Sequence, residues 1–88
     1  MDIHFTYAGR EIDVACNESD TVKLYAVPTG YSEDGLYAAV WRAGEVEPFP
    51  ACDGNEAHLL AEVYVQQGQD GAVIGGSLTE GVEAYATH

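Results

Sequence analysis

Apolar and polar side chains alternate along the first sixteen residues, which is typical of β-strands with one buried face. The apolar positions fall on odd numbers before residue 8 and on even numbers after it: Ile3, Phe5, Tyr7, Ile12, Val14 and Cys16. This change of parity predicts a hairpin whose loop is Ala8 and Gly9, with these apolar side chains on one face of the sheet. The opposite face is expected to be exposed. It carries Glu11 and sets His4 against Asp13.

Three further segments have the composition of strands. Residues 21–27 (TVKLYAV) form a β-branched and aromatic run that ends at a proline, and another run begins at Leu36. Ala43 and Gly44 are spaced to close a second hairpin, although two prolines soon after them restrict the returning strand to a short or edge position. Residues 72–76 (AVIGG) favour a short buried strand.

One segment changes to a helical period. Apolar residues recur at spacings of three and four within 55–67: Ala57, Leu60, Ala61 and Tyr64. Asp53 is placed as an N-cap with Glu56 three residues later, and Gly68 suits a left-handed exit, so both ends of the helix are marked. Residues 77–88 fit either a last strand or a frayed helical turn.

These elements predict an α+β fold, a small antiparallel sheet of about four to six strands built from hairpins and packed on one helix at 55–67. The predicted core is Ile3, Phe5, Ile12, Val14, Leu60 and Tyr64. With 88 residues, 47% of them hydrophobic, the chain has the length and composition of a single globular domain over residues 1–88.

The charge of the chain is strongly unbalanced. Fifteen acidic residues face three basic ones, which gives a formal net charge of -12. Internal ion pairs cannot neutralise this excess, so most carboxylates are expected to be solvated and mutually repelling. Such a surface repels nucleic acids and anionic lipids, because proteins bind both through Lys and Arg.

The sequence also bears on location and on the cysteines. No apolar run approaches the roughly 18 residues that span a bilayer, and the amino-terminal MDIHFTY lacks the features of a signal peptide. We therefore expect a cytoplasmic protein.

Cys16 and Cys52 are too few for a disulfide scaffold and lack zinc-site spacing, so two reduced thiols are favoured over one disulfide.

The candidate catalytic and metal-binding motifs are weak, so the sequence favours a protein that is not an enzyme and holds no cofactor or metal. Glu11 and Asp13 would lie about 7 Å apart on an exposed strand, without the apolar pocket that raises one carboxyl pKa. The DGNE segment at 53–56 departs from the calcium-loop pattern and fits a helix cap. Cys52 precedes the predicted helix that carries His58, but no other thiol-hydrolase motif accompanies the pair.

Acidic residues and one tyrosine are the candidate contacts for a partner. Carboxylates two positions apart on a strand are spaced like successive phosphates of a nucleic acid. Two pairs could therefore present phosphate-like rows: Glu11 with Asp13, and Glu45 with Glu47. Tyr31 is an aromatic side chain beside acids in a polar loop, which is typical of a protein-binding loop. The predicted partner-binding residues are Glu11, Asp13, Glu18, Asp20, Tyr31, Glu33, Asp34, Glu45 and Glu47.

We expect the partner to be a basic protein surface, with no direct nucleic-acid or membrane binding, and a homodimer is also compatible with the chain. In size, acidity, lack of catalytic motifs and expected sheet-plus-helix fold, the whole chain resembles phage-encoded inhibitors of bacterial defence, such as anti-CRISPR proteins and acidic DNA mimics. The resemblance implies blocking of the nucleic-acid groove of a defence nuclease or surveillance complex. Two alternatives stay open: a structural or oligomer-forming protein of a salt-adapted organism, and a small Cys/His hydrolase.

Overall fold

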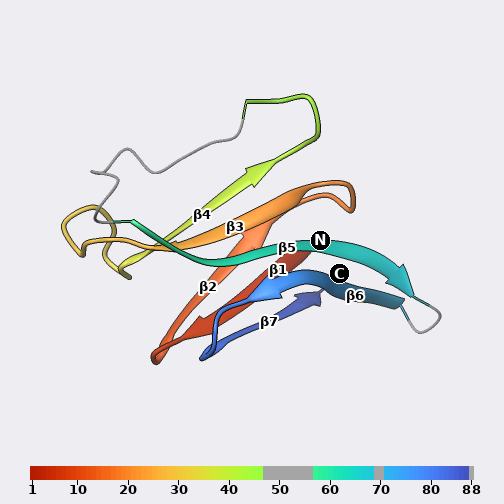
Figure 1. Cartoon of the computed structure of the whole chain (residues 1–88). Helices are drawn as coiled ribbons and strands as arrows, with labels where there is room; N and C mark the ends of the chain where they lie inside the picture. The colour runs from red at the N-terminus through yellow and green to blue at the C-terminus, as the bar shows by residue number, and fades with distance from the viewer. Residues whose placement is uncertain (47–56, 69–70, 88) are drawn as a thin grey trace.

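The computed structural model describes residues 1–46, 57–68 and 71–87. In these ranges the strands are β1 (Asp2–Tyr7), β2 (Arg10–Ala15), β3 (Thr21–Ala26), β4 (Leu36–Trp41), β5 (His58–Gly68), β6 (Gly71–Leu78) and β7 (Val82–Thr87). They form two antiparallel sheets, ordered β2-β1-β7 and β4-β3-β5-β6, whose strands run obliquely to one another (Figure 1). The described ranges contain no helix, so the α+β prediction is wrong and the fold is all-β.

The amino-terminal hairpin has the predicted register. Phe5 pairs with Ile12 and His4 pairs with Asp13. Ala8 and Gly9 have φ angles of 51° and 77°. A positive φ at both residues is typical of a tight two-residue hairpin loop. The prediction of this hairpin from the change of parity is confirmed.

The last strand joins the first. β7 pairs antiparallel with β1 from Asp2 opposite Thr87 to Tyr7 opposite Val82, so β1 is the central strand of the three-stranded sheet. Figure 1 accordingly shows the two ends of the chain close together. Of the two possibilities for residues 77–88, the strand is the one that the structure has.

The four-stranded sheet begins with the predicted strands β3 and β4, which pair antiparallel. After β4, the amide of Glu45 donates a hydrogen bond of 3.1 Å to the carbonyl of Arg42, so the chain turns where a second hairpin loop was predicted. The returning strand predicted beyond residue 46 lies outside the described residues.

Residues 58–67, within the segment predicted as a helix, belong to the long strand β5, so that prediction is wrong. Opposite β3, Ala61 pairs with Leu24 and Leu59 pairs with Tyr25, which leaves Leu60 as an extra residue in the ladder. This β-bulge allows the neighbours Leu60 and Ala61 both to be buried. Two consecutive buried apolar residues interrupt the alternation of a strand and imitate helical spacing.

Beyond the bulge, β5 alternates as a strand should. Val63 and Val65 are buried, whereas Tyr64 is 41% exposed, so its predicted place in the core is wrong. The Tyr64 ring lies against Gly75 of β6, where an added Cβ would come within 2.7 Å of a ring carbon. The predicted N-cap at Asp53 lies outside the described residues.

The main core lies between the two sheets. Its buried members are Ile3, Phe5, Val14, Cys16, Val22, Leu24, Leu36, Leu60, Ala61, Val63, Val65 and Val82. Ile12 is half-buried and packs against this cluster. Complete burial of an aromatic side chain such as Phe5 stabilises the folded state by about 1.5 to 3 kcal/mol, so these alternating positions hold the two sheets together.

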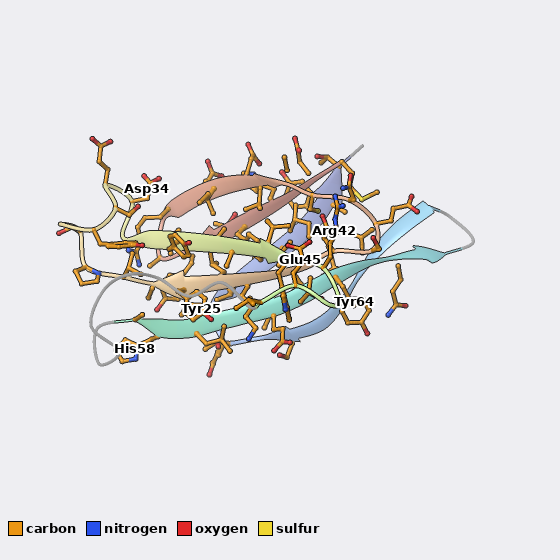
Figure 2. The ribbon with its side chains drawn as sticks, turned by 90° about the horizontal axis from the view of Figure 1, so that it is seen from above. Tyr25, Asp34, Arg42, Glu45, His58 and Tyr64 are labelled. Carbon is orange, nitrogen blue, oxygen red and sulfur yellow. The ribbon has the colours of Figure 1, made fainter. Side chains whose placement is uncertain are left out.

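A smaller apolar cluster lies on the outer face of the four-stranded sheet. Tyr25, Val27 and Ala39 are buried there, with Tyr37 packed against them. Figure 2 shows Tyr25 over the strands of this sheet, to the left of the centre of the view. The outer face of the three-stranded sheet is different, because most of its outward positions are polar. Within the described ranges no helix is long and apolar enough to cross a membrane.

Candidate functional site

The outer face of the three-stranded sheet gathers acidic side chains from all three of its strands. Because Ile3 and Phe5 point into the core, the intervening positions of β1 and their partners on β2 and β7 point outward. Four of these outward residues are exposed carboxylates: Asp2, Glu11, Asp13 and Glu83. With His4 and Tyr85, which lie among them, they form what we call the acidic face.

His4 lies at the centre of the acidic face and contacts both neighbouring strands. Its Nδ1 is 2.5 Å from Oδ1 of Asp13, and its Nε2 is 3.5 Å from Oε1 of Glu11. On the other side, the centre of its ring is 4.9 Å from that of Tyr85, with 33° between the ring planes. The side chain of His4 is only 16% exposed, whereas Tyr85 is 54% exposed.

These contacts favour the protonated imidazole. The hydrogen bond with Asp13 is the largest cause that raises the pKa of His4 above its ordinary value of 6.5. Partial desolvation opposes this effect, while the charge of Asp13 and the hydrogen bond and charge of Glu11 add to it. The centre of an otherwise anionic face therefore holds a cation over a wider pH range than an isolated histidine would.

Asp20, one of the predicted partner contacts, has a structural role. It is 3% exposed, and its Oδ1 accepts a hydrogen bond of 2.9 Å from Nε of Arg42. Its Oδ2 accepts another, also of 2.9 Å, from the amide of Asn17. The carboxylate therefore closes the turn between β2 and β3, while Glu18 in the same turn is exposed.

The loop between β3 and β4 carries three other predicted contacts. Tyr31 is 39% exposed and packs edge-on against Tyr37, with ring centres 5.6 Å apart. Glu33 and Asp34 are exposed. The Asp34 carbonyl accepts a hydrogen bond of 3.0 Å from Nη1 of Arg10, so this loop is tied to the amino-terminal hairpin.

The remaining predicted contacts lie at the other end of the four-stranded sheet. Glu45 is exposed in the turn after β4, and Figure 2 shows it beside Arg42 and far along the sheet from Asp34. Glu47 lies outside the described residues. The six residues of β3 connect the two ends and span about 20 Å. The structure thus brings Glu11 and Asp13 together but distributes the other described candidates over separate places.

The three Lys and Arg side chains of the protein all make their contacts away from the acidic face. Arg42 pairs with Asp20, and Nζ of Lys23 lies 5.2 Å from the centre of the Trp41 ring. The Arg10 guanidinium lies 5.2 Å from the centre of the Tyr7 ring and also donates a hydrogen bond to the Asp34 carbonyl in the loop after β3. The outward positions of β1, β2 and β7 carry no Lys or Arg, so only His4 balances their carboxylates.

The described residues give no support to the candidate catalytic and metal-binding sites. His58 is exposed at the start of the strand β5 and not on a helix as predicted, and Cys52 lies outside the described residues. Cys16 is a free thiol whose pKa is raised, first of all by burial, which makes it a weak nucleophile. In 1–46, 57–68 and 71–87, no group of three or more His, Cys, Asp or Glu side chains is arranged to hold a metal.

Sequence reasoning missed the contribution of β7 to this face. From Val82 to Thr87 the side chains follow the alternating pattern of a strand, and the sequence alone shows this pattern. Nothing in the sequence indicates that β7 pairs with β1, because pairing between distant strands leaves no local pattern. Glu83 and Tyr85 are therefore functional candidates that only the fold reveals.

The chain has no match among models of protein families, curated proteins or solved structures. Part of the likeness to phage-encoded inhibitors of bacterial defence was an expected sheet packed on one helix, and the all-β fold removes that part. Neither the fold nor the comparisons support the hypothesis that the protein is a phage-encoded inhibitor of the anti-CRISPR kind. Over the residues that the structure describes, the fold and the site define an all-β protein of two antiparallel sheets, one of which presents an acidic outer face.

Proposed function

We propose that this protein is a non-enzymatic binding protein whose acidic face engages a basic surface of another protein. The observation that carries the proposal is the gathering of four exposed carboxylates from three strands on a sheet face that has no Lys or Arg. Charges of one sign gathered on one face attract and orient an oppositely charged partner. The protein acts in the cytoplasm in this proposal, and the free thiol of Cys16 suits a reducing compartment.

A protein surface suits this face better than a small molecule does. The side chains lie on an open sheet, where a small ligand would keep most of its hydration, whereas a second protein can exclude water over a broad area. Tyr85 supplies the aromatic anchor that protein interfaces favour, and it stands among carboxylates that would pair with Lys or Arg. The same negative charge disfavours nucleic acid.

The second candidate is an acidity that serves solvation in a salt-adapted organism. It is favoured by the exposed acids outside the acidic face, which lie in turns and loops of both sheets: Glu18, Glu33, Asp34, Glu45 and Glu80. In that case charge would matter only through its total amount. The two functions therefore differ in whether the position of a carboxylate affects binding.

The test compares two double variants that remove the same charge at different places. Glu11→Gln with Asp13→Asn removes two of the four carboxylates of the acidic face, and Glu33→Gln with Glu45→Gln is the matched control on exposed turns. Each protein is titrated with a fluorescent arginine-rich peptide at low and at physiological salt. At low salt the first pair should weaken binding by about 1 to 3 kcal/mol and the control by much less, since screening is weakest there.

Equal losses in the two double variants would reject the acidic face as the binding site and favour the solvation alternative. Thermal melts of each variant confirm that folding is retained. A Tyr85→Ala variant adds a test that leaves the charge unchanged, and it should weaken binding without altering the dependence on salt.

A further inference from the structure

The two ring nitrogens of His4 face carboxylates at the same time, Nδ1 toward Asp13 and Nε2 toward Glu11. A neutral imidazole has one N–H donor and one nitrogen lone pair, and an ionised carboxylate only accepts hydrogen bonds. In the neutral form, one of the two contacts would therefore set a lone pair against a negatively charged oxygen. Only the imidazolium, with two N–H donors, satisfies both contacts.

His4 is also the one basic side chain among the outward positions of the three-stranded sheet. Around it lie Glu11 and Asp13 of β2, Tyr85 and Glu83 of β7, and Asp2 of its own strand. The imidazolium therefore serves the acidic face as an internal counter-ion. A partner that brings Lys or Arg to Glu11 and Asp13 competes with it for the same oxygens.

We propose that a basic partner displaces His4 as the counter-ion of Glu11 and Asp13, so that binding at the acidic face is coupled to release of the His4 proton. The inference rests on the proposed function and adds its regulation by pH. An arriving guanidinium takes over the carboxylates and places a second positive charge beside the ring, and both changes disfavour the imidazolium. The neutral ring can remain packed against Tyr85, since that contact does not depend on the proton.

The direction of the pH dependence follows from linkage. In the free protein, the contacts with Asp13 and Glu11 hold the pKa of His4 above 6.5, and in the complex its pKa is lower. Between those two pKa values the partner binds more tightly as pH rises, by up to about tenfold per pH unit for one released proton. Above the pKa of the free protein the affinity reaches a plateau, because no proton remains to be released.

The experiment uses the full chain and an arginine-rich peptide, whose charge is constant over the pH range. Calorimetric titrations in two buffers of different ionisation enthalpy give the number of protons released, and NMR follows the ring protons of His4 in the free and bound states. We expect release of up to one proton per bound peptide and a lower His4 pKa in the complex. His58, exposed on the other sheet, is the internal control, and its ring signals should not change when the peptide binds.

The variant His4→Gln separates this coupling from attraction by charge alone. It lacks the counter-ion, so it should bind the peptide more tightly than the wild type at acidic pH, equally at alkaline pH, and without proton release. His58→Gln is the matched control and should keep the pH profile of the wild type. The proton count on the wild type does not depend on whether either variant folds.

Binding at the acidic face with no proton released, or with the same pH profile in wild type and His4→Gln, would overturn the inference and leave the proposed function intact. Equal losses in the two charge-matched double variants would remove the binding site and the inference with it. The two failures are therefore distinguished within one set of titrations.

Discussion

At the scale of single residues, Asp20 shows that the carboxylates of this chain have different roles. In the segment CNESDT, nothing distinguishes it from its acidic neighbour Glu18. In the structure, its amide donates a hydrogen bond of 3.0 Å to the carbonyl of Asn17, and its carboxylate accepts one from the amide of Asn17. These reciprocal bonds close the turn, and Arg42 compensates the buried charge.

Replacing Asp20 by alanine should therefore destabilise the fold by about 2 kcal/mol, because the change leaves the Asn17 amide and the Arg42 guanidinium without their acceptor. The expected loss of stability is smaller than for a fully buried ion pair, because the Arg42 side chain is 57% exposed. The measurement is the free energy of unfolding in urea. Glu33→Ala, in an exposed loop, should change it by less than about 0.5 kcal/mol. Equal stability of the two variants would contradict a structural role for Asp20.

At the scale of elements, what could be predicted depends on whether the pattern of a segment is local. The amino-terminal hairpin was predictable to the register, because alternation and a two-residue loop together determine which side chains face each other. β5 was not, because the extra residue Leu60 shifts its parity and the bulge depends on pairing with β3. The helix assigned there followed from a spacing that a bulged strand also produces.

The candidate site divides in the same way. The contact of His4 with Asp13 follows from the hairpin register, and the sequence therefore predicted that these two residues share a face. Glu83 and Tyr85 reach the same face through pairing of strands from opposite ends of the chain, which no local pattern indicates. Burial of Asp20 was likewise unpredictable, since its partner Arg42 lies 22 residues away.

Two neighbouring residues of β5 distinguish the strand from the helix. Val63 is completely buried, so Val63→Ala should cost about 2 kcal/mol of stability through lost burial and the cavity left behind. Tyr64 is 41% exposed on the outer face, and Tyr64→Ala should cost less than about 1 kcal/mol despite the larger deletion. Urea denaturation of both variants gives the comparison. The reverse order is what the helical interpretation requires, and it would contradict the strand.

At the scale of the whole molecule, the charge is an excess that the fold cannot neutralise internally. Fifteen acids meet three basic residues, and each of those three is engaged with a carboxylate, a carbonyl or an aromatic ring in the structure. Exposed carboxylates of like sign raise the free energy of the compact state, because unfolding moves them apart. Repulsion between its carboxylates is therefore expected to lower the free energy of unfolding of the protein.

Added salt should consequently raise the melting temperature. Between about 0.01 M and about 1 M salt, the Debye length falls from about 30 Å to about 3 Å, so repulsion between distant carboxylates disappears. Scanning calorimetry across this range gives the shift, which should be smaller for Glu33→Gln with Glu45→Gln because less repulsion remains to be screened. A melting temperature that is constant or falls with salt would show that self-repulsion does not limit stability.

The pairing of the first strand with the last also bears on how the chain folds as it is synthesised. Asp2 and Thr87, which are 85 residues apart, lie opposite each other, so the second edge of β1 stays open until β7 has been made. A two-stranded hairpin alone is marginal in water, and Ile3 and Phe5 stay uncovered until the other sheet arrives. Folding is then a late and collective event, governed by contacts of long sequence separation, and small β proteins of this kind typically need milliseconds to seconds.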